Sequence, residues 1–133
     1  MTLSWQDHVA INELLALHGH LCDTGALDRL DEVFTDDIAY DVTDFGFGVL
    51  RGLAANRDAA LALGEGNPVG HHITNVILTE QAPGRVHARS KGIGITTDGT
   101  CGSATYDDTV VHGEKGWRIS ERIVRARRVP LHG

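Results

Sequence analysis

The second half of the chain alternates between strand-like segments and turn residues, and this pattern limits the possible folds most strongly. Four segments are rich in β-branched and aliphatic side chains, as strands are: residues 71–78, 86–97, 101–111 and 117–124. Asp98-Gly99, between two of them, is a typical hairpin signal, and strands that short turns connect pair antiparallel. We therefore expect a mostly antiparallel sheet, in which Gly92 and Gly94 mark a bulge or a sharp bend.

The first helix is predicted from a capping signal and a periodic apolar stripe. Ser4 and Asp7 have the spacing of a capping box. Apolar residues then recur every three or four positions over residues 11–22, as on one face of a helix. His18 lies within this stripe, whereas His20 falls nearly opposite.

Two shorter helices and one strand are predicted next. The helices cover residues 27–34 and 53–63, and residues 38–42 alternate as a strand after an expected turn at residues 35–37. Tyr40 points to the same side of this strand as its apolar neighbours two residues away. This order predicts an α+β fold, in which a curved, mostly antiparallel sheet wraps around three N-terminal-half helices as a cone with a pocket at its open end.

Composition and charge argue against several classes of partner. With 133 residues, the chain is expected to form one domain, residues 1–133. The net charge of −6 and the pI near 5.7 argue against binding to nucleic acid or to an anionic membrane surface. No apolar run approaches the ~18 residues of a membrane span. The cysteines Cys22 and Cys101 fit no zinc or redox spacing, so we expect a cytoplasmic protein with reduced thiols.

One basic cluster lies near the C-terminus. Its members are Arg122, Arg125, Arg127 and Arg128. A run of like charge is usually solvated, so the cluster is interpreted as an exposed face of the last strand, and no binding role is predicted for it.

Four segments, in order and with matching gaps, resemble a known group. They are Leu14-Leu15 and Asp23 with Asp28-Arg29-Leu30; Val33-Phe34-Thr35-Asp36-Asp37; His71-His72-Ile73-Thr74-Asn75; and Tyr106-Asp107-Asp108 with Gly116-Trp117-Arg118-Ile119. The chain resembles the SnoaL-like branch of the NTF2-like superfamily, which includes polyketide cyclases, scytalone dehydratase and ketosteroid isomerase. The resemblance implies an NTF2-like cone for nearly the whole chain. It is less specific for a reaction, because one fold hosts many functions.

Within this group, the dehydratase pattern is the most similar. It uses an aspartate at the end of the first helix, a histidine that opens the strand after the third helix and a tyrosine on the first strand. The matching residues here are Asp23, His71 and Tyr40. The resemblance implies that His71 is the general acid/base, that Asp23 orients it, and that Tyr40 holds a substrate carbonyl or a water. The dehydratase also has a second tyrosine directly before its aspartate, where this chain has Cys22.

Each of these residues also has a structural interpretation. Asp23 could cap the helix that follows it, and Tyr40 could be an amphipathic core residue. Periodicity does not decide whether His71 or His72 faces inward, because neither alternating set is cleanly apolar, although the resemblance favours His71. His18 could line the pocket or be a hydrogen-bonded core residue. The other candidate substrate-binding residues are Asn75, Tyr106 and Asp108.

No metal and no cofactor are expected. The chain has eight histidines, but neighbouring ones such as His71 and His72 point to opposite faces of a strand and are poorly placed to chelate one ion. No glycine-rich phosphate loop leads from a strand into a helix. Cys22 and Cys101 have no activating partner in the sequence, which lowers the case for a nucleophile.

The predicted function is cofactor-independent general acid/base catalysis by a lyase or isomerase of the dehydratase or cyclase type. The substrate would be a small, largely apolar, oxygenated compound, polyketide-like or steroid-like. It would lose a proton next to a carbonyl during dehydration, isomerisation or cyclisation. One alternative is an epoxide hydrolase of the same fold, and another is a non-catalytic ligand-binding or scaffold subunit. A homodimer or homotrimer is expected, because an exposed face of such a sheet commonly pairs with itself.

Overall fold

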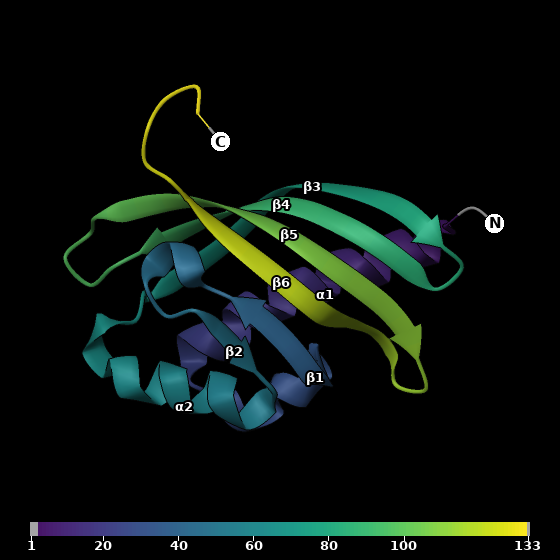
Figure 1. The fold of residues 1–133 in the computed structure, drawn as a ribbon, viewed down its shortest axis with the longest axis horizontal. Coiled ribbons are helices and arrows are strands. Elements are labelled where there is room, and N and C mark those ends of the chain that lie inside the picture. Colours follow the sequence, from purple (N-terminus) through teal and green to yellow (C-terminus); the bar gives the residue numbers. More distant parts are fainter. Residues whose placement is uncertain (1–2, 133) are drawn as a thin grey trace.

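The computed structural model of the protein describes residues 3–132 (Figure 1). Its helices are α1 (Trp5–Thr24) and α2 (Leu53–Leu63), with the short 3₁₀ helices η1 (Leu27–Glu32), η2 (Thr43–Phe45) and η3 (Gly64–Gly66). The strands are β1 (Phe34–Asp41), β2 (Val49–Arg51), β3 (Gly70–Ala82), β4 (Arg85–Ile95), β5 (Cys101–Gly113) and β6 (Gly116–Arg127). The predicted α+β class is confirmed.

The strands form one sheet in the order β2-β1-β6-β5-β4-β3. Neighbouring strands are antiparallel except for β1 and β6, which run parallel. In Figure 1, α1 crosses under the long strands of the curved sheet, and α2 lies beside β1 and β2. The helices therefore cover one face of the sheet, and the buried core lies between that face and α1.

Helix α1 begins at the predicted capping box and ends at a glycine. The Ser4 hydroxyl accepts a hydrogen bond from the Asp7 backbone N–H at 3.1 Å, and the Asp7 carboxylate accepts one from the Ser4 N–H at 3.2 Å. Gly25 ends the helix with φ 73°, a conformation that glycine adopts without strain. A second Asp7 oxygen accepts a hydrogen bond from Trp117 Nε1 at 3.1 Å, which joins the start of α1 to β6.

Strand β1 is longer than predicted. Residues 35–37 belong to the strand, so the expected turn at this place is wrong. Phe34 and Ile38 are buried on either side of these polar residues. The pairing of β1 with β6 shifts between Phe34 and Ala39, and this irregularity interrupts the alternation that would have revealed the strand. The short strand β2 has no counterpart among the strands predicted from the sequence.

Gly92 and Gly94 do not mark a bulge, so this part of the expectation is wrong. Strand β4 pairs with β5 without a register shift along its whole length. A Cβ atom on Gly92 would overlap the ring of Tyr106, which lies across it from β5. Gly92 therefore makes room for a neighbouring aromatic side chain, which is a common reason for glycine inside a strand.

The bulge lies in β3 instead. Asn75 has φ 56°, and the pairing of β3 with β4 shifts between Thr74 and Ile77. One extra residue reverses the face to which later side chains point. His71, before the bulge, is consequently on the same side as Val76, after it. This explains why neither alternating set of the β3 sequence is cleanly apolar.

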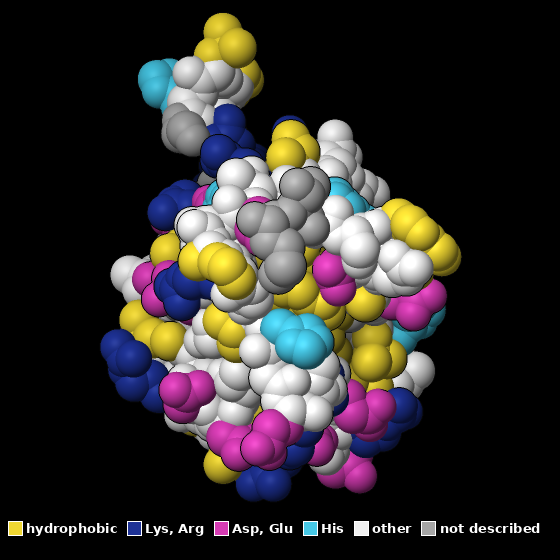
Figure 2. Space-filling view, turned by 90° about the vertical axis from the view of Figure 1, so that its right-hand side faces the viewer, with side chains coloured by type: hydrophobic (Ala, Val, Ile, Leu, Met, Phe, Trp, Pro, Cys, Tyr) yellow, Lys and Arg dark blue, Asp and Glu magenta, His cyan; other side chains and the backbone are white. Residues whose placement is uncertain are grey.

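The surface has charges of both signs. Figure 2 shows acidic and basic side chains interspersed over one face of the molecule, with apolar side chains exposed between them. Among the exposed apolar residues are Ile77 and Ile93, on β3 and β4. None of the helices within residues 3–132 combines the length and the hydropathy needed to cross a bilayer.

Candidate active site

A cavity of about 650 Å³ lies between the helices and the inner face of the sheet. Its mostly apolar lining includes Leu30, Phe34, Leu50, Leu63, Ala104 and Val124. The polar side chains that converge on it include His18, Cys22, Tyr40, Asn56, His71 and Tyr106. No Asp or Glu within residues 3–132 lines it. Apolar walls with a few convergent polar groups are typical of sites for small organic molecules.

Asp23 and His71 meet at the wall of this cavity. Asp23 Oδ1 lies 2.6 Å from His71 Nδ1, and Asp23 Oδ2 accepts a hydrogen bond from the His71 backbone N–H at 3.0 Å. Asp23 is in the last turn of α1, and His71 is the second residue of β3. Gly19 allows this approach, because a Cβ atom there would lie 2.9 Å from the His71 carbonyl oxygen. A glycine on the helix thus leaves room for the start of β3 to pack closely on α1.

The contact fixes the protonation of the neutral His71 ring. A carboxylate only accepts hydrogen bonds, so the proton of the ring resides on Nδ1 and the lone pair resides on Nε2. His71 lines the cavity, and Asp23 is bound on the other side of the ring, outside the lining. This is the arrangement of a base whose tautomer and orientation are held by an acceptor.

Two alternatives for these residues are resolved by the same geometry. The capping interpretation of Asp23 does not hold, because Ala26 occupies the N-cap position of η1 and no side chain caps that helix. His72 is exposed and does not line the cavity. Of the adjacent histidines on β3, His71 is therefore the one that faces the cavity.

Tyr40 and Tyr106 bring two phenols to the cavity from β1 and β5. Burial raises the pKa of both hydroxyls above the usual range, so both stay protonated and available as hydrogen-bond donors. Both rings lie near the guanidinium of Arg122, with 5.8 Å from Arg122 Cζ to the ring centroid of Tyr40 and 4.5 Å to that of Tyr106. The chain has Cys22 where the dehydratase pattern has its second tyrosine, and Tyr106 supplies a second phenol from another element.

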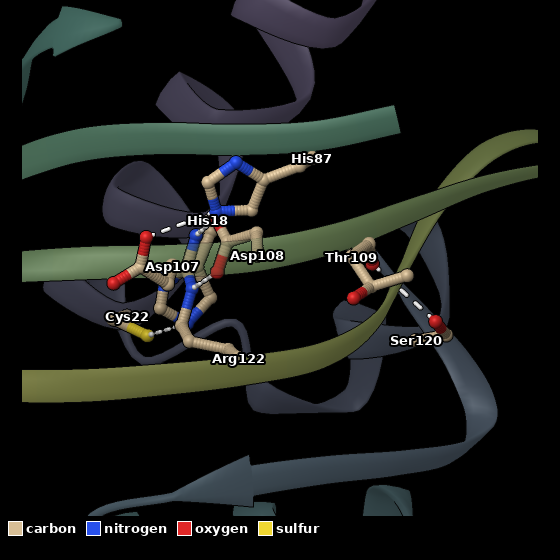
Figure 3. A network of polar contacts seen from close by, with 8 residues as sticks. All are labelled: His18, Cys22, His87, Asp107, Asp108, Thr109, Ser120 and Arg122. Atoms are coloured by element: carbon tan, nitrogen blue, oxygen red, sulfur yellow. Dashed lines mark hydrogen bonds and ion pairs between the residues drawn. The ribbon is translucent and has the colours of Figure 1, made fainter. Parts of the chain in front are cut away.

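A buried chain of polar contacts runs from the sheet to α1 (Figure 3). Arg122, on β6, donates to both carboxylate oxygens of Asp108, on β5, at 2.7 and 2.9 Å. A third nitrogen of Arg122 lies 2.9 Å from His18 Nδ1, and His18 Nε2 lies 3.4 Å from the sulfur of Cys22. Arg122 and Asp108 have no exposed side-chain surface. The prediction that Arg122 is part of a solvated face is therefore wrong.

Burial governs the titration of this chain of contacts. Burial and the nearby Arg122 charge lower the pKa of His18 well below its ordinary value. Burial raises the pKa of the Cys22 thiol to about 11. Burial alone would also lower the pKa of Arg122, but the Asp108 carboxylate outweighs it and raises this pKa. At neutral pH the chain thus consists of an ion pair, a neutral imidazole and a thiol.

The remaining predicted site residues have different positions. His18 and Tyr106 line the cavity. Asn75 is exposed in the β3 bulge and Asp108 is completely buried, and neither lines the cavity. Their positions therefore do not support the predicted substrate contacts: Asn75 supplies the backbone turn of the bulge, and Asp108 holds Arg122.

Sequence reasoning missed the importance of Arg122. Asp108 shares a strand face with the apolar Tyr106 and Val110, and a carboxylate that faces a core needs a cation. This requirement was the available signal for Arg122. Within residues 3–132, the structure has no cluster of three or more His, Cys, Asp or Glu side chains placed to hold a metal ion.

Comparison with known proteins agrees with this architecture. A protein from Novosphingobium aromaticivorans, provisionally named an aromatic ring hydroxylase, has a TM-score of 0.78 and 26% identity, over 96% of this chain and 94% of that one. A second protein of this organism, provisionally named a scytalone dehydratase, has a TM-score of 0.77 and 21% identity, over 97% and 90%. LinA has a TM-score of 0.78 and 20% identity, over 98% and 96%.

A further neighbour from Novosphingobium aromaticivorans is described as an NTF2-like protein with a cystatin-like fold, which agrees with the predicted cone. No curated protein sequence matches the chain. Residues 4–123 match the SnoaL-like domain. With its cavity, its curved sheet and this match over most of its length, the chain belongs to the SnoaL-like domain family.

Proposed function

We propose that the protein is a cofactor-independent general acid/base enzyme, a lyase or isomerase of the dehydratase or cyclase type. His71 is the base and Asp23 its orienting partner. The substrate is a small, largely apolar, oxygenated molecule that loses a proton next to a carbonyl. The observation that carries this proposal is the 2.6 Å contact between Asp23 and His71 at the wall of an apolar cavity.

The reaction follows from where protons reside. His71 Nε2 takes a proton from the carbon next to the substrate carbonyl, and the electron pair of the broken C–H bond moves to form an enolate. Asp23 stabilises the imidazolium that results. Tyr40 and Tyr106, both protonated, donate hydrogen bonds to the enolate oxygen. His71 then returns the proton, either to a leaving hydroxyl, which departs as water, or to another carbon.

The alternatives have less support. An epoxide hydrolase that activates water with carboxylates would need an acidic side chain that lines the cavity, and among residues 3–132 the nearby Asp23 lies behind His71 and no Asp or Glu belongs to the lining. A non-catalytic binding or scaffold protein would use the same cavity but would not need the orienting contact between Asp23 and His71.

We also propose that the protein self-associates as a homodimer or homotrimer through the outer face of the sheet, where Ile77 and Ile93 are exposed. We further propose a cytoplasmic location, where the free Cys22 and Cys101 stay reduced.

Proton abstraction can be tested before the substrate is identified. The purified protein is incubated in D₂O with acetophenone or cyclohexanone, and NMR measures exchange of the protons next to the carbonyl. We expect exchange above the buffer rate, which falls about 10²–10⁴-fold in His71→Ala. Asp23→Asn should also slow it. His72→Ala is the matched control, because His72 is the exposed neighbour and should change little.

The opposite result has a clear meaning. If His71→Ala and His72→Ala exchange these protons at the same rate as the unmodified protein, His71 is not the base. If the unmodified protein gives only the buffer rate with both ketones although NMR shows them bound, the binding or scaffold alternative is favoured.

A further inference from the structure

The buried Arg122 is in direct contact with His18. Asp108 engages two nitrogens of the guanidinium at 2.7 and 2.9 Å and so fixes its plane. The remaining terminal nitrogen lies 2.9 Å from His18 Nδ1. In Figure 3, Arg122 connects Asp108 to His18, and the His18 ring connects it in turn to Cys22.

The chemistry of arginine determines the direction of this hydrogen bond. A guanidinium has donors only, so His18 Nδ1 must be the acceptor. In the neutral ring the proton is then on Nε2, which lies 3.4 Å from the Cys22 sulfur. His18 therefore donates its Nε2–H toward the sulfur, which is a weak acceptor.

This direction excludes one interpretation of the neighbouring cysteine and histidine. A nucleophilic cysteine needs a histidine lone pair that accepts the thiol proton. The Nδ1 lone pair of His18 is used by Arg122, and Nε2 carries a proton. The Cys22 thiol also keeps its proton, because burial raises its pKa to about 11. Cys22 and His18 are consequently not a nucleophilic pair.

His18 and His71 differ in the protonation of Nε2. Asp23, which only accepts, leaves a lone pair on His71 Nε2. Arg122, which only donates, leaves a proton on His18 Nε2. Both rings line the same cavity. A site for proton abstraction needs both a base and a donor to the developing oxygen charge.

We propose that His18 acts as a neutral hydrogen-bond donor to a substrate oxygen in the cavity that it shares with the base His71, and that Arg122 is the positioning residue that keeps it in this state. The substrate oxygen replaces the Cys22 sulfur as acceptor of the Nε2–H. The catalytic part of the proposal rests on the proposed function, whereas the assignment of the His18 tautomer does not.

The surroundings of His18 favour this neutral state. The groups that face the ring are Arg122 from β6, His71 from β3, Cys22 from α1, and the rings of Phe34 and Tyr40 from β1 at 5.1 and 6.0 Å. None of them is an anion, and a second positive charge next to the buried guanidinium would be unfavourable. We therefore expect His18 to remain neutral when acidification protonates exposed histidines.

The first test reads both histidines separately in the unmodified protein. With ¹⁵N in the histidine rings, NMR distinguishes a protonated from an unprotonated ring nitrogen. We expect His18 with its proton on Nε2 and no charge at pH values at which exposed histidines are already protonated, and His71 with its proton on Nδ1 near neutral pH. A proton on His18 Nδ1, or a charged His18 near pH 6, would overturn the inference. A free His71 Nδ1 would instead count against the proposed base, so the two failures are distinguishable.

The second test addresses Arg122. The double variant Arg122→Met with Asp108→Leu removes the donor together with its counter-ion. The matched control, Arg122→Gln with Asp108→Asn, keeps an amide N–H near His18. We expect the His18 ring to become protonated on acidification, or to take both tautomers, only in the first variant. Unchanged His18 signals in a folded first variant would show that Arg122 does not set the tautomer. If that variant does not fold, the signals of the unmodified protein still decide the tautomer.

The third test addresses the donor role with two probes of similar shape. Acetophenone carries a carbonyl oxygen, and ethylbenzene does not. We expect both to shift signals of the cavity residues and only acetophenone to move the His18 Nε2–H proton strongly downfield. An equal shift with both probes would overturn the donor role. No perturbation by either probe up to its solubility would contradict the open cavity on which both proposals rest.

Discussion

Two histidines line the cavity, and a different polar residue holds each of them: Asp23 contacts His71, and Arg122 contacts His18. The two contacts differ in burial. The Asp23 and His71 side chains keep 23% and 20% of their surface exposed. The Asp108 and Arg122 side chains, which lie behind His18, keep none. A partly exposed pair can be broken at small energetic cost, because water solvates the group that remains. A fully buried pair cannot, because breaking it leaves an uncompensated charge in the core. Changing the Asp23–His71 contact is therefore expected to affect catalysis more than stability, whereas the Arg122–Asp108 pair is also needed for the stability of the fold.

The largest effect expected from this difference is on the stability of the buried pair. Arg122→Met should lower the free energy of unfolding by about 3–5 kcal/mol, because it leaves the Asp108 carboxylate buried without a partner. The double variant Arg122→Met with Asp108→Leu should recover most of this loss. Denaturant unfolding followed by circular dichroism measures both. A double variant as unstable as the single one would show that unpaired charge is not the cause.

A smaller loss is expected where a glycine makes room for Tyr106. Gly92→Ala should cost about 1–3 kcal/mol, because the new methyl group overlaps the Tyr106 ring and the packed strand must shift. Gly94→Ala is the control, since its nearest neighbour, a Pro68 carbon at 3.5 Å, is in ordinary contact. Adding Tyr106→Ala should make Gly92→Ala nearly neutral. Equal losses in Gly92→Ala and Gly94→Ala would indicate a general backbone effect instead.

The burial of His18 also predicts that the stability of the protein depends on pH. The pKa of His18 in the folded protein lies well below its ordinary value of 6.5, mainly because the ring is buried. Below about pH 6.5 the unfolded chain binds a proton that the folded chain does not. Stability from neutral His18 is therefore fully present above that pH and is lost as the pH falls toward the folded-state pKa, by up to about 1.4 kcal/mol per pH unit.

Unfolding measured between about pH 7 and about pH 5 tests this. His18→Gln should flatten the decline in stability, whereas His20→Gln, a change to the exposed histidine on the same helix, should leave it as it is. A decline of the same steepness in both variants would assign the acid sensitivity to other groups.

The same comparison separates what the sequence predicted from what it did not. Helices α1 and α2, the long antiparallel strands and the approach of Asp23 to His71 follow from capping, periodicity, turn residues and family resemblance. The errors lie where one residue changes the register. After the bulge at Asn75, the side chains of β3 point to the opposite face from the one that simple alternation predicts. Sequence periodicity does not reveal such a bulge, because its position is defined by the pairing with the neighbouring strand. Arg122 was misjudged for a related reason: a charged side chain is predicted as solvated until the buried Asp108 opposite it is known.

The smallest effect expected on stability comes with a large effect on chemistry. Asp23→Asn should change the free energy of unfolding by no more than about 1 kcal/mol, because both partners are partly exposed and the amide can still hydrogen-bond. Asparagine, however, can donate to His71 Nδ1 as well as accept, so the ring is no longer held in one tautomer. We therefore expect slower proton exchange from bound acetophenone together with a mixed tautomer signal from His71. The unfolding curve should be almost unchanged. If Asp23→Asn instead unfolds early and leaves both the exchange rate per folded molecule and the His71 tautomer unchanged, the contact is structural, and the contrast between the Asp23–His71 contact and the Arg122–Asp108 pair disappears.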